Sequence, residues 1–189
     1  MVNILLGVSG SVAAIKLVEL VTSLKGRNSN VNIKIVFTPR GKFFVKDADL
    51  RAISAEVDAI FTDEQEWLIW ERKGDQVLHI ELRRWADIFL IAPLSANTMA
   101  KLANGLCDNL LTSIVRAWDT SKRIVVCPAM NTFMWENPIT SRQLDVIRDV
   151  YKAHVILPKD KHLLACGDMG SGALQDINVV VENVLSLVK

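Results

Sequence analysis

The chain begins with VNILLGVSGSVAA (residues 2–14), a nearly continuous apolar run followed by small and polar residues. Residues Val2 to Val8 are expected to form a strand that is buried on both faces, because apolar residues do not alternate with polar ones. From Ser11 to Leu24 the apolar residues recur at helical spacing, which predicts a helix directly after the strand. Small residues let the backbone between them approach a ligand closely, and the helix start offers free N–H groups to a phosphate. A tight turn in which Ser11 caps the helix is an equally good interpretation.

The same order of strand and helix recurs along the chain, and it predicts an α/β fold. Further strands are expected at residues 31–37, 86–92, 123–127 and 154–157, and further helices at 43–48, 96–103, 110–118, 140–153 and 176–188. Residues 39–76 give a mixed signal. The alternation predicts a doubly wound, mostly parallel sheet flanked by helices, of the Rossmann or flavodoxin type. No repeat or linker divides the chain, so residues 1–189 are expected to form one domain.

Composition excludes several functional classes. Half of the 189 residues are hydrophobic and the formal net charge is +1, with the positive residues scattered along the chain. These values argue against disorder and against a nucleic-acid partner. The longest apolar run, residues 88–93, is too short to cross a membrane. Three separated cysteines (Cys107, Cys127 and Cys166) predict neither a disulfide framework nor a zinc site, so we expect a reducing, cytoplasmic protein with no catalytic metal.

Polar and small residues concentrate where four of the predicted strands end. These stretches are residues 7–12, 38–40, 93–98 and 127–131. Ligands of open α/β sheets bind beyond the carboxyl ends of the strands, so a ligand is expected there. Within residues 93–98, the side chains of Ser95, Asn97 and Thr98 could hold a phosphate, a ribityl chain or the edge of a ring. A capped helix start would also explain them.

Four further residues have a possible chemical role. Asn131 directly follows a buried strand, where its carboxamide could bind a carboxylate or amide, and Met134 is equally consistent with plain packing. Cys166 begins a loop with three glycines that could act as a lid, although an incidental surface cysteine is the simpler interpretation. His79 could transfer a proton, although a structural histidine is the commoner case. His154 and His162 have no comparable setting.

Taken in order, six segments of the chain match one family. They are GSVAA (residues 10–14), HIELRRWAD (79–87), APLSANT (92–98), GLCDNLLT (105–112), PAMNTFMW (128–135) and ACGD (165–168). With these segments the chain resembles the flavin-containing cysteine decarboxylases, and most closely the eukaryotic single-function phosphopantothenoylcysteine decarboxylases and the related plant halotolerance proteins. The resemblance covers nearly the whole chain.

The resemblance implies a cofactor, FMN, and a role for each matching residue. The residues that would hold FMN are Ser11, Val12, Ala13, Thr38, Ser95, Ala96, Asn97, Thr98 and Ala129. His79 matches the family's catalytic base, and Cys166 matches the proton donor in the lid. Asn131 matches the residue that binds the substrate, Met134 packs at the same place, and Arg84 is a weaker candidate for a substrate or flavin contact.

The resemblance also implies the reaction and the assembly. The small-molecule substrate would be 4'-phosphopantothenoylcysteine, which is converted to 4'-phosphopantetheine during coenzyme A biosynthesis. Transient oxidation of the cysteine thiol to a thioaldehyde would provide an electron sink for loss of CO2, and the resulting enethiolate would then be reduced again. Members of this family are homotrimers with sites between subunits, so His79 would act opposite the Asn131 and Cys166 of another chain.

Some features depart from the family or leave an alternative open. After Gly172 the family usually continues Ala-Met-Ala-Glu, whereas this chain has Ala-Leu-Gln-Asp at residues 173–176. A flavin-binding regulatory subunit of a protein phosphatase is one alternative, but the matches to His79, Asn131 and Cys166 favour the enzyme. A peptidyl-cysteine decarboxylase or a prenyltransferase would require other substrate-site residues than the HIELRRWAD segment.

Overall fold

The computed structural model describes residues 1–68, 70–160, 162–164, 167 and 169–188. Its main feature is a six-stranded parallel sheet with the strand order β3-β2-β1-β4-β5-β6. The strands are β1 (Val2–Val8), β2 (Val31–Phe37), β3 (Ala59–Phe61), β4 (Ile88–Leu94), β5 (Arg123–Pro128) and β6 (His154–Val155). A small antiparallel pair follows, β7 (His162–Leu163) and β8 (Met169–Gly170). The predicted doubly wound parallel sheet is therefore confirmed.

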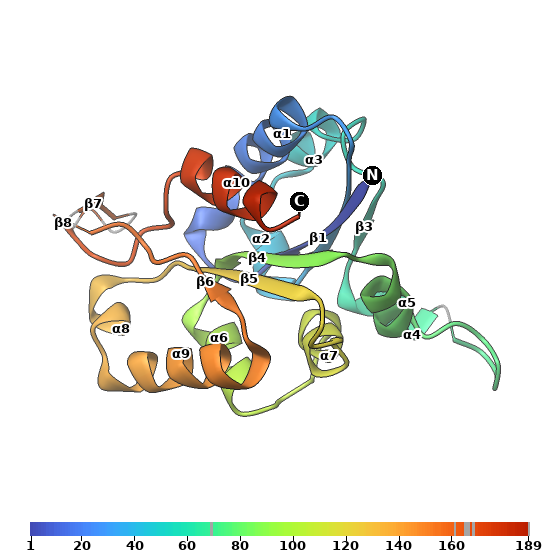
Figure 1. Cartoon of the computed structure of the whole chain (residues 1–189). Coiled ribbons are helices and arrows are strands. Elements are labelled where there is room, and N and C mark those ends of the chain that lie inside the picture. Colours follow the sequence, from blue (N-terminus) through green and yellow to red (C-terminus); the bar gives the residue numbers. More distant parts are fainter. Residues whose placement is uncertain (69, 161, 165–166, 168, 189) are drawn as a thin grey trace.

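Helices cover both faces of this sheet (Figure 1). Alternate residues of β1 show the division, since Ile4 and Leu6 belong to one buried apolar cluster and Leu5 to the other. One face is covered by the 3-10 helix η1 (Val12–Lys16) and by α1 (Leu17–Arg27), α3 (Asp47–Ala52) and α10 (Ile177–Ser186). The opposite face is covered by α5 (Leu78–Trp85), α6 (Ala96–Ala103), α7 (Leu110–Arg116) and α9 (Pro138–Tyr151). Burial on both faces explains why β1 and β4 are nearly continuous apolar runs, whereas β2 has the polar residues Asn32 and Lys34 at half-buried positions.

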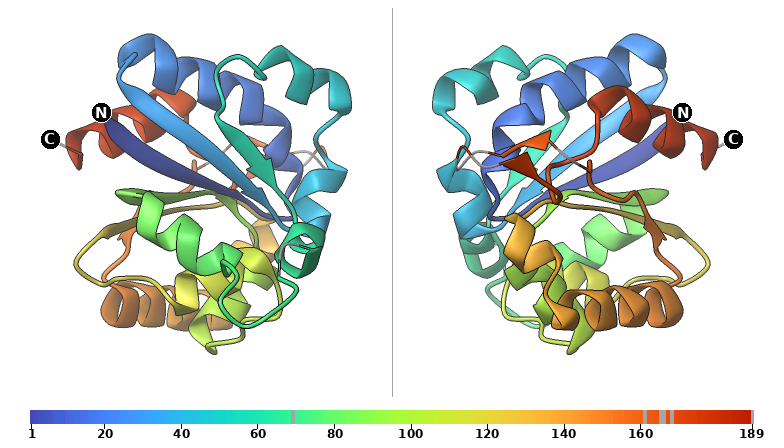
Figure 2. Two further views of the ribbon diagram at one scale, coloured as in Figure 1. Left: turned by 90° about the vertical axis from the view of Figure 1, so that its right-hand side faces the viewer. Right: turned by 90° about the vertical axis from the view of Figure 1, so that its left-hand side faces the viewer.

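Three short helices complete the fold. They are α2 (Pro39–Phe43), α4 (Asp63–Leu68) and α8 (Thr132–Trp135). Figure 1 places α4 and α5 at one end of the molecule, and α8 with the β7–β8 pair at the other. Figure 2, in its right-hand view, looks onto the end that carries α8 and β7–β8.

Several predicted boundaries are wrong, and local capping explains the clearest case. The sequence predicts one helix at 43–48, but the structure has α2 before this range and α3 beginning inside it. Thr38 caps α2 by accepting a hydrogen bond from the Gly41 N–H, and Pro39 occupies the first turn, so the helix begins four residues early. The predicted helix from Ser11 to Leu24 begins as the 3-10 helix η1 and continues as α1 to Arg27.

The sequence predicted none of the elements β3, α4, α5, α8, β7 and β8. The other differences are shifts of a few residues, as expected where the apolar pattern fades at the end of an element. The structure has β4 at 88–94, α7 ending at 116, β5 ending at 128, α9 at 138–151, β6 at 154–155 and α10 at 177–186. Within the described ranges, no helix is both long enough and apolar enough to span a membrane.

Candidate functional site

Two adjoining cavities lie at the carboxyl ends of the central strands. The larger one, here called the apolar cavity, has a volume of about 570 Å³ and is bounded by the loops after β1 and β5, the start of α6, α8 and β7. The smaller one, the polar cavity, has about 530 Å³ and is bounded by the starts of α2 and α6 and the approach to α7. Gly10, Ser95 and Asn97 line both cavities. The expected position of a ligand, beyond the strand ends, thus coincides with two connected spaces.

Ser9 joins the two loops that form the shared wall. Its side chain is fully buried, and its hydroxyl donates to the Pro93 carbonyl at 2.8 Å and accepts from the Ser95 N–H at 2.7 Å. The backbone N–H of Ser9 also donates to the Pro93 carbonyl at 3.2 Å. These bonds fix the loop after β1 against the loop after β4. The sequence analysis missed Ser9, although it stands within the predicted ligand loop.

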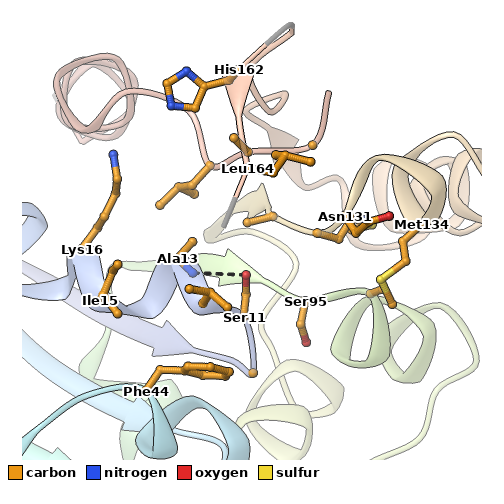
Figure 3. A pocket seen from close by; sticks show the side chains of 18 of the residues that line it. Ser11, Ala13, Ile15, Lys16, Phe44, Ser95, Asn131, Met134, His162 and Leu164 are labelled. Atoms are coloured by element: carbon orange, nitrogen blue, oxygen red, sulfur yellow. Dashed lines mark hydrogen bonds between the residues drawn. The ribbon is translucent and has the colours of Figure 1, made fainter. Parts of the chain in front are cut away.

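The floor of the apolar cavity comes from the first helical turn after β1. Ser11 caps η1 by accepting from the Ala13 N–H at 3.4 Å, and Val12 and Ala13 line the cavity (Figure 3). Phe44 contributes an aromatic ring from the end of α2. Lys16 is the only lysine or arginine among the described residues that line this cavity, and His162 is the only histidine.

The polar cavity gathers the amino ends of three helices, capped by Thr38, Ser95 and Asn109. Ser95 Oγ accepts from the Thr98 N–H at 3.3 Å and lies 3.2 Å from Thr98 Oγ1. Arg40 lines the same cavity and forms no ion pair with any residue that the structure describes. Helix amino ends together with a guanidinium attract anions, so this cavity has the chemistry of a phosphate site.

The other charged residues of the polar cavity are one ion pair and one carboxylate that has no cationic partner among the described residues. Lys101 Nζ lies 2.6 Å from Asp108 Oδ2, and this hydrogen bond holds the pKa of Asp108 below its usual value. Asp63 accepts from the Leu110 N–H at 2.9 Å, yet burial raises the pKa of its carboxyl above the usual value. Arg40 is therefore the cation best placed to meet an anion in this cavity.

The rim of the apolar cavity is formed by the loop after β5. Ala129 and Asn131 line the cavity, and Asn131 caps α8 by accepting from the Phe133 N–H at 2.9 Å. Met134 extends from α8 toward the same space, with half of the residue exposed. The structure therefore brings Asn131 and Met134 to the same cavity as Ser11, Val12 and Ala13.

The C-terminal loop packs closely against this rim. Thr132 Oγ1 donates to the Ser171 carbonyl at 3.0 Å, and the Met130 N–H donates to the Gly172 carbonyl at 2.9 Å. A Cβ added to Gly172 would lie 2.5 Å from the Met130 carbonyl oxygen, and the Gly172 φ of +110° also favours glycine. The sequence suggested that glycines here give a lid its freedom, but at Gly172 the structure shows a requirement for close packing.

The predicted cofactor residues divide between the two cavities. Ser11, Val12, Ala13, Ala96 and Ala129 line the apolar cavity, Thr38 and Thr98 the polar one, and Ser95 and Asn97 both. FMN likewise combines an apolar part with a charged part, since its ring is flat and largely apolar and its phosphate is anionic. The residues present thus suit FMN: those of the apolar cavity could hold its ring, and Arg40 with the helix amino ends could bind its phosphate.

Two of the predicted site residues lie outside both cavities, and a third falls outside the described residues. His79 stands on α5 and lines neither cavity, and its ring Nδ1 lies 2.5 Å from Glu66 Oε1. Arg84 also lines neither cavity, and it pairs with Glu81 on its own helix at 2.7 Å. Cys166 lies outside the described residues.

Sequence reasoning overlooked some lining residues and judged others correctly. His162, which has no suggestive sequence neighbours, lines the apolar cavity because the β7–β8 pair carries it there. Arg40 lies within the predicted ligand stretch 38–40, and Lys16 follows the stretch 7–12, so their positions in the sequence could have signalled them. Cys127 is buried, and burial raises the pKa of its thiol.

Comparison with known proteins identifies the class to which this fold and site belong. The profile of the Flavoprotein family matches residues 1–189. The chain belongs to that family.

The individual relatives narrow this class further. The chain is 49% identical over 182 residues to a phosphopantothenoylcysteine decarboxylase of Oryza sativa subsp. japonica, which covers 96% of this chain and 79% of the relative. Among solved structures, a PPC decarboxylase cysteine-to-serine mutant complexed with pantothenoylaminoethenethiol is 46% identical, with a TM-score of 0.89 over 98% of this chain and 97% of the other. The FMN binding protein AtHal3 is 47% identical, with a TM-score of 0.86 over 97% and 95%.

These relatives confirm three expectations drawn from the sequence. The resemblance to the phosphopantothenoylcysteine decarboxylases is confirmed, and so are a carboxy-lyase activity and FMN as the cofactor.

Proposed function

We propose that this chain decarboxylates 4'-phosphopantothenoylcysteine to 4'-phosphopantetheine, a step of coenzyme A biosynthesis. The observation that carries the proposal is the pair of joined cavities, which offers an apolar space and an anion site to one cofactor and leaves Asn131 at the rim for a substrate. We further propose that residues 1–189 act as one FMN-binding domain in a cytoplasmic protein.

Each chemical role in the proposal falls to a particular side chain. Bound FMN would supply a reversible hydride acceptor, which lets the substrate thiol pass through a thioaldehyde so that CO2 can leave. Asn131 would bind the substrate through its carboxamide, and Met134 would pack beside it. His79 would accept a proton, and Cys166 would return one to the enethiolate. Arg84 is the weaker candidate for a further contact.

A ring of three chains accounts for the position of His79 in this proposal. His79 lines neither cavity and lies on α5, whereas Asn131 belongs to the end of the molecule that carries α8 (Figure 1). Both ends expose large apolar side chains, for example Trp67 at 81% and Phe133 at 80%. Contact between two unlike surfaces produces a closed ring when the rotation closes. We therefore propose a homotrimer in which the His79 of one chain completes the cavity of the next.

The proposal is tested by measuring CO2 release from 4'-phosphopantothenoylcysteine with the purified, FMN-loaded protein. His79→Asn and Cys166→Ser should each lower turnover by at least about a hundredfold, since proton transfer by a placed group contributes this much. The matched controls are His154→Asn and Cys107→Ser, which change an exposed residue of the same type. Both controls should retain activity within about twofold. A yellow wild-type protein that releases no CO2 would contradict the proposal and favour a regulatory flavoprotein.

A further inference from the structure

An acidic side chain that is largely shielded from solvent stands beside the proposed catalytic histidine. Glu66 belongs to α4 and His79 to the first turn of α5, and Glu66 Oε1 lies 2.5 Å from His79 Nδ1. The side chain of Glu66 is only 10% exposed, while that of His79 is 27% exposed. The contact therefore joins two separate helices and shields the carboxylate more than the ring.

The chemistry of the two groups determines which ring nitrogen carries the proton. An ionised carboxylate only accepts hydrogen bonds, so Nδ1 of His79 must be the donor in this contact. In the neutral ring, Nε2 then carries the lone pair and can accept a proton. Among the described residues, no side chain or backbone group forms a hydrogen bond with Nε2. Nε2 is thus the basic nitrogen of the His79 ring.

The other oxygen of the carboxylate indicates a function beyond helix packing. Glu66 Oε2 is buried and has no hydrogen-bond partner among the described residues. Leaving one oxygen of a buried carboxylate unpaired is unfavourable, and a neutral side chain would join α4 to α5 without that penalty. A carboxylate is needed, in contrast, if the ring beside it becomes positively charged during the reaction.

We propose that Glu66 is a positioning residue that holds His79 as its Nδ1–H tautomer with Nε2 available as the proton acceptor. This inference rests on the proposed function. When the S–H bond of the substrate thiol breaks, its proton forms a new N–H bond at Nε2. The Glu66 carboxylate stabilises the resulting imidazolium through the Nδ1–H hydrogen bond.

Histidine nitrogen NMR tests the tautomer directly. The chain has three histidines, so the His79 signals in FMN-loaded, 15N-histidine-labelled protein can be assigned by their absence from His79→Asn. Wild-type protein should show a protonated Nδ1 and an unprotonated Nε2. Glu66→Ala should shift the ring toward the Nε2–H form. The control is Glu64→Ala, an exposed residue of the same helix, which should leave the His79 signals unchanged.

Steady-state kinetics provide the second readout. Both Glu66→Ala and the isosteric Glu66→Gln should lower kcat by about 10- to 100-fold, because neither can neutralise the imidazolium, while KM should stay within about twofold. Thermal unfolding identifies any variant that fails to fold, and Glu66→Gln preserves the shape of the side chain. A wild-type tautomer in Glu66→Ala, or a wild-type kcat in folded Glu66→Gln, would overturn the proposal. If wild-type protein releases no CO2, the proposed function fails, and the NMR measurement still decides whether Glu66 sets the ring of His79.

Discussion

At the scale of single residues, Ser9 joins the loop after β1 to the start of α6 through two side-chain hydrogen bonds. We expect Ser9→Ala to lower the free energy of unfolding by about 1–3 kcal/mol, because the Ser95 N–H loses its acceptor in a buried setting. FMN should also bind less tightly, since Ser95 lines both cavities. Urea unfolding and FMN titration measure the two effects. Ser141→Ala removes an exposed hydroxyl bond within α9 and should change stability by less than about 0.5 kcal/mol. Equal losses in the two variants would refute this role for Ser9.

A second residue-scale prediction concerns the close contact between Gly41 and β1. A Cβ at Gly41 would lie 2.1 Å from the Val8 carbonyl oxygen, which is held in place by a hydrogen bond from the Thr38 N–H. Gly41→Ala should therefore destabilise the protein by at least about 2 kcal/mol. Gly26→Ala is the matched control, because nothing lies within 4 Å of its added Cβ in α1. That variant should gain about 0.5–1 kcal/mol from helix propensity, as thermal unfolding can show.

At the scale of elements, the start of α7 depends on a reciprocal cap. The Asn109 side chain accepts from the Thr112 N–H at 3.0 Å, and Thr112 Oγ1 accepts from the Asn109 N–H at 3.3 Å. We expect Asn109→Ala to destabilise the protein by about 1 kcal/mol and Asn109→Ser, which can still cap, by less than half of that. Chemical unfolding provides the measurement. Indistinguishable stabilities for the two variants would mean that the cap contributes nothing here.

The connection between α6 and α7 leads to a prediction about pH. Lys101 holds the pKa of Asp108 below its usual value of 3.8. A carboxylate whose pKa is lowered on folding adds stability above its usual pKa, and that contribution disappears as the pH falls through the folded value. At neutral pH the free energy of unfolding of wild type should therefore be higher than that of Asp108→Asn. The difference should be less than about 1 kcal/mol, because the ion pair is exposed. The difference should narrow below a pH of about 4 in urea unfolding, and a constant difference would argue against the ion pair.

At the scale of the whole molecule, the proposed trimer predicts that two inactive variants can restore each other. His79→Asn and Asn131→Asp each damage a different part of the proposed site. In a randomly mixed ring of the two variants, about a quarter of the sites would combine an intact His79 from one chain with an intact Asn131 from its neighbour. Co-expression should thus recover about a quarter of wild-type CO2 release, and sedimentation should give the mass of three chains. No recovery in a mixed trimer would mean that both residues act within one chain.

Much of the fold follows from local sequence pattern. Residues 2–8 and 31–37 are predicted as strands and observed with the same bounds, because polar or small residues follow each of these mostly apolar segments and mark its end. The prediction of helix starts was less accurate at residues 39–52. There Thr38 caps a short helix that the apolar pattern does not reveal. A cap depends on one hydrogen bond and leaves almost no periodic signal.

The sequence by itself determined the parallel sheet, the edge at which we propose that a ligand binds and many of the residues that line the two cavities. It could do so because strand burial and strand order carry these residues to one edge. Only the tertiary structure decided that Ser9 joins two loops 84 residues apart, that His162 reaches the apolar cavity, and that Glu66 meets His79. These contacts join residues far apart in the chain or on separate helices. Their geometry is therefore set by how packed elements meet, and no local pattern encodes it.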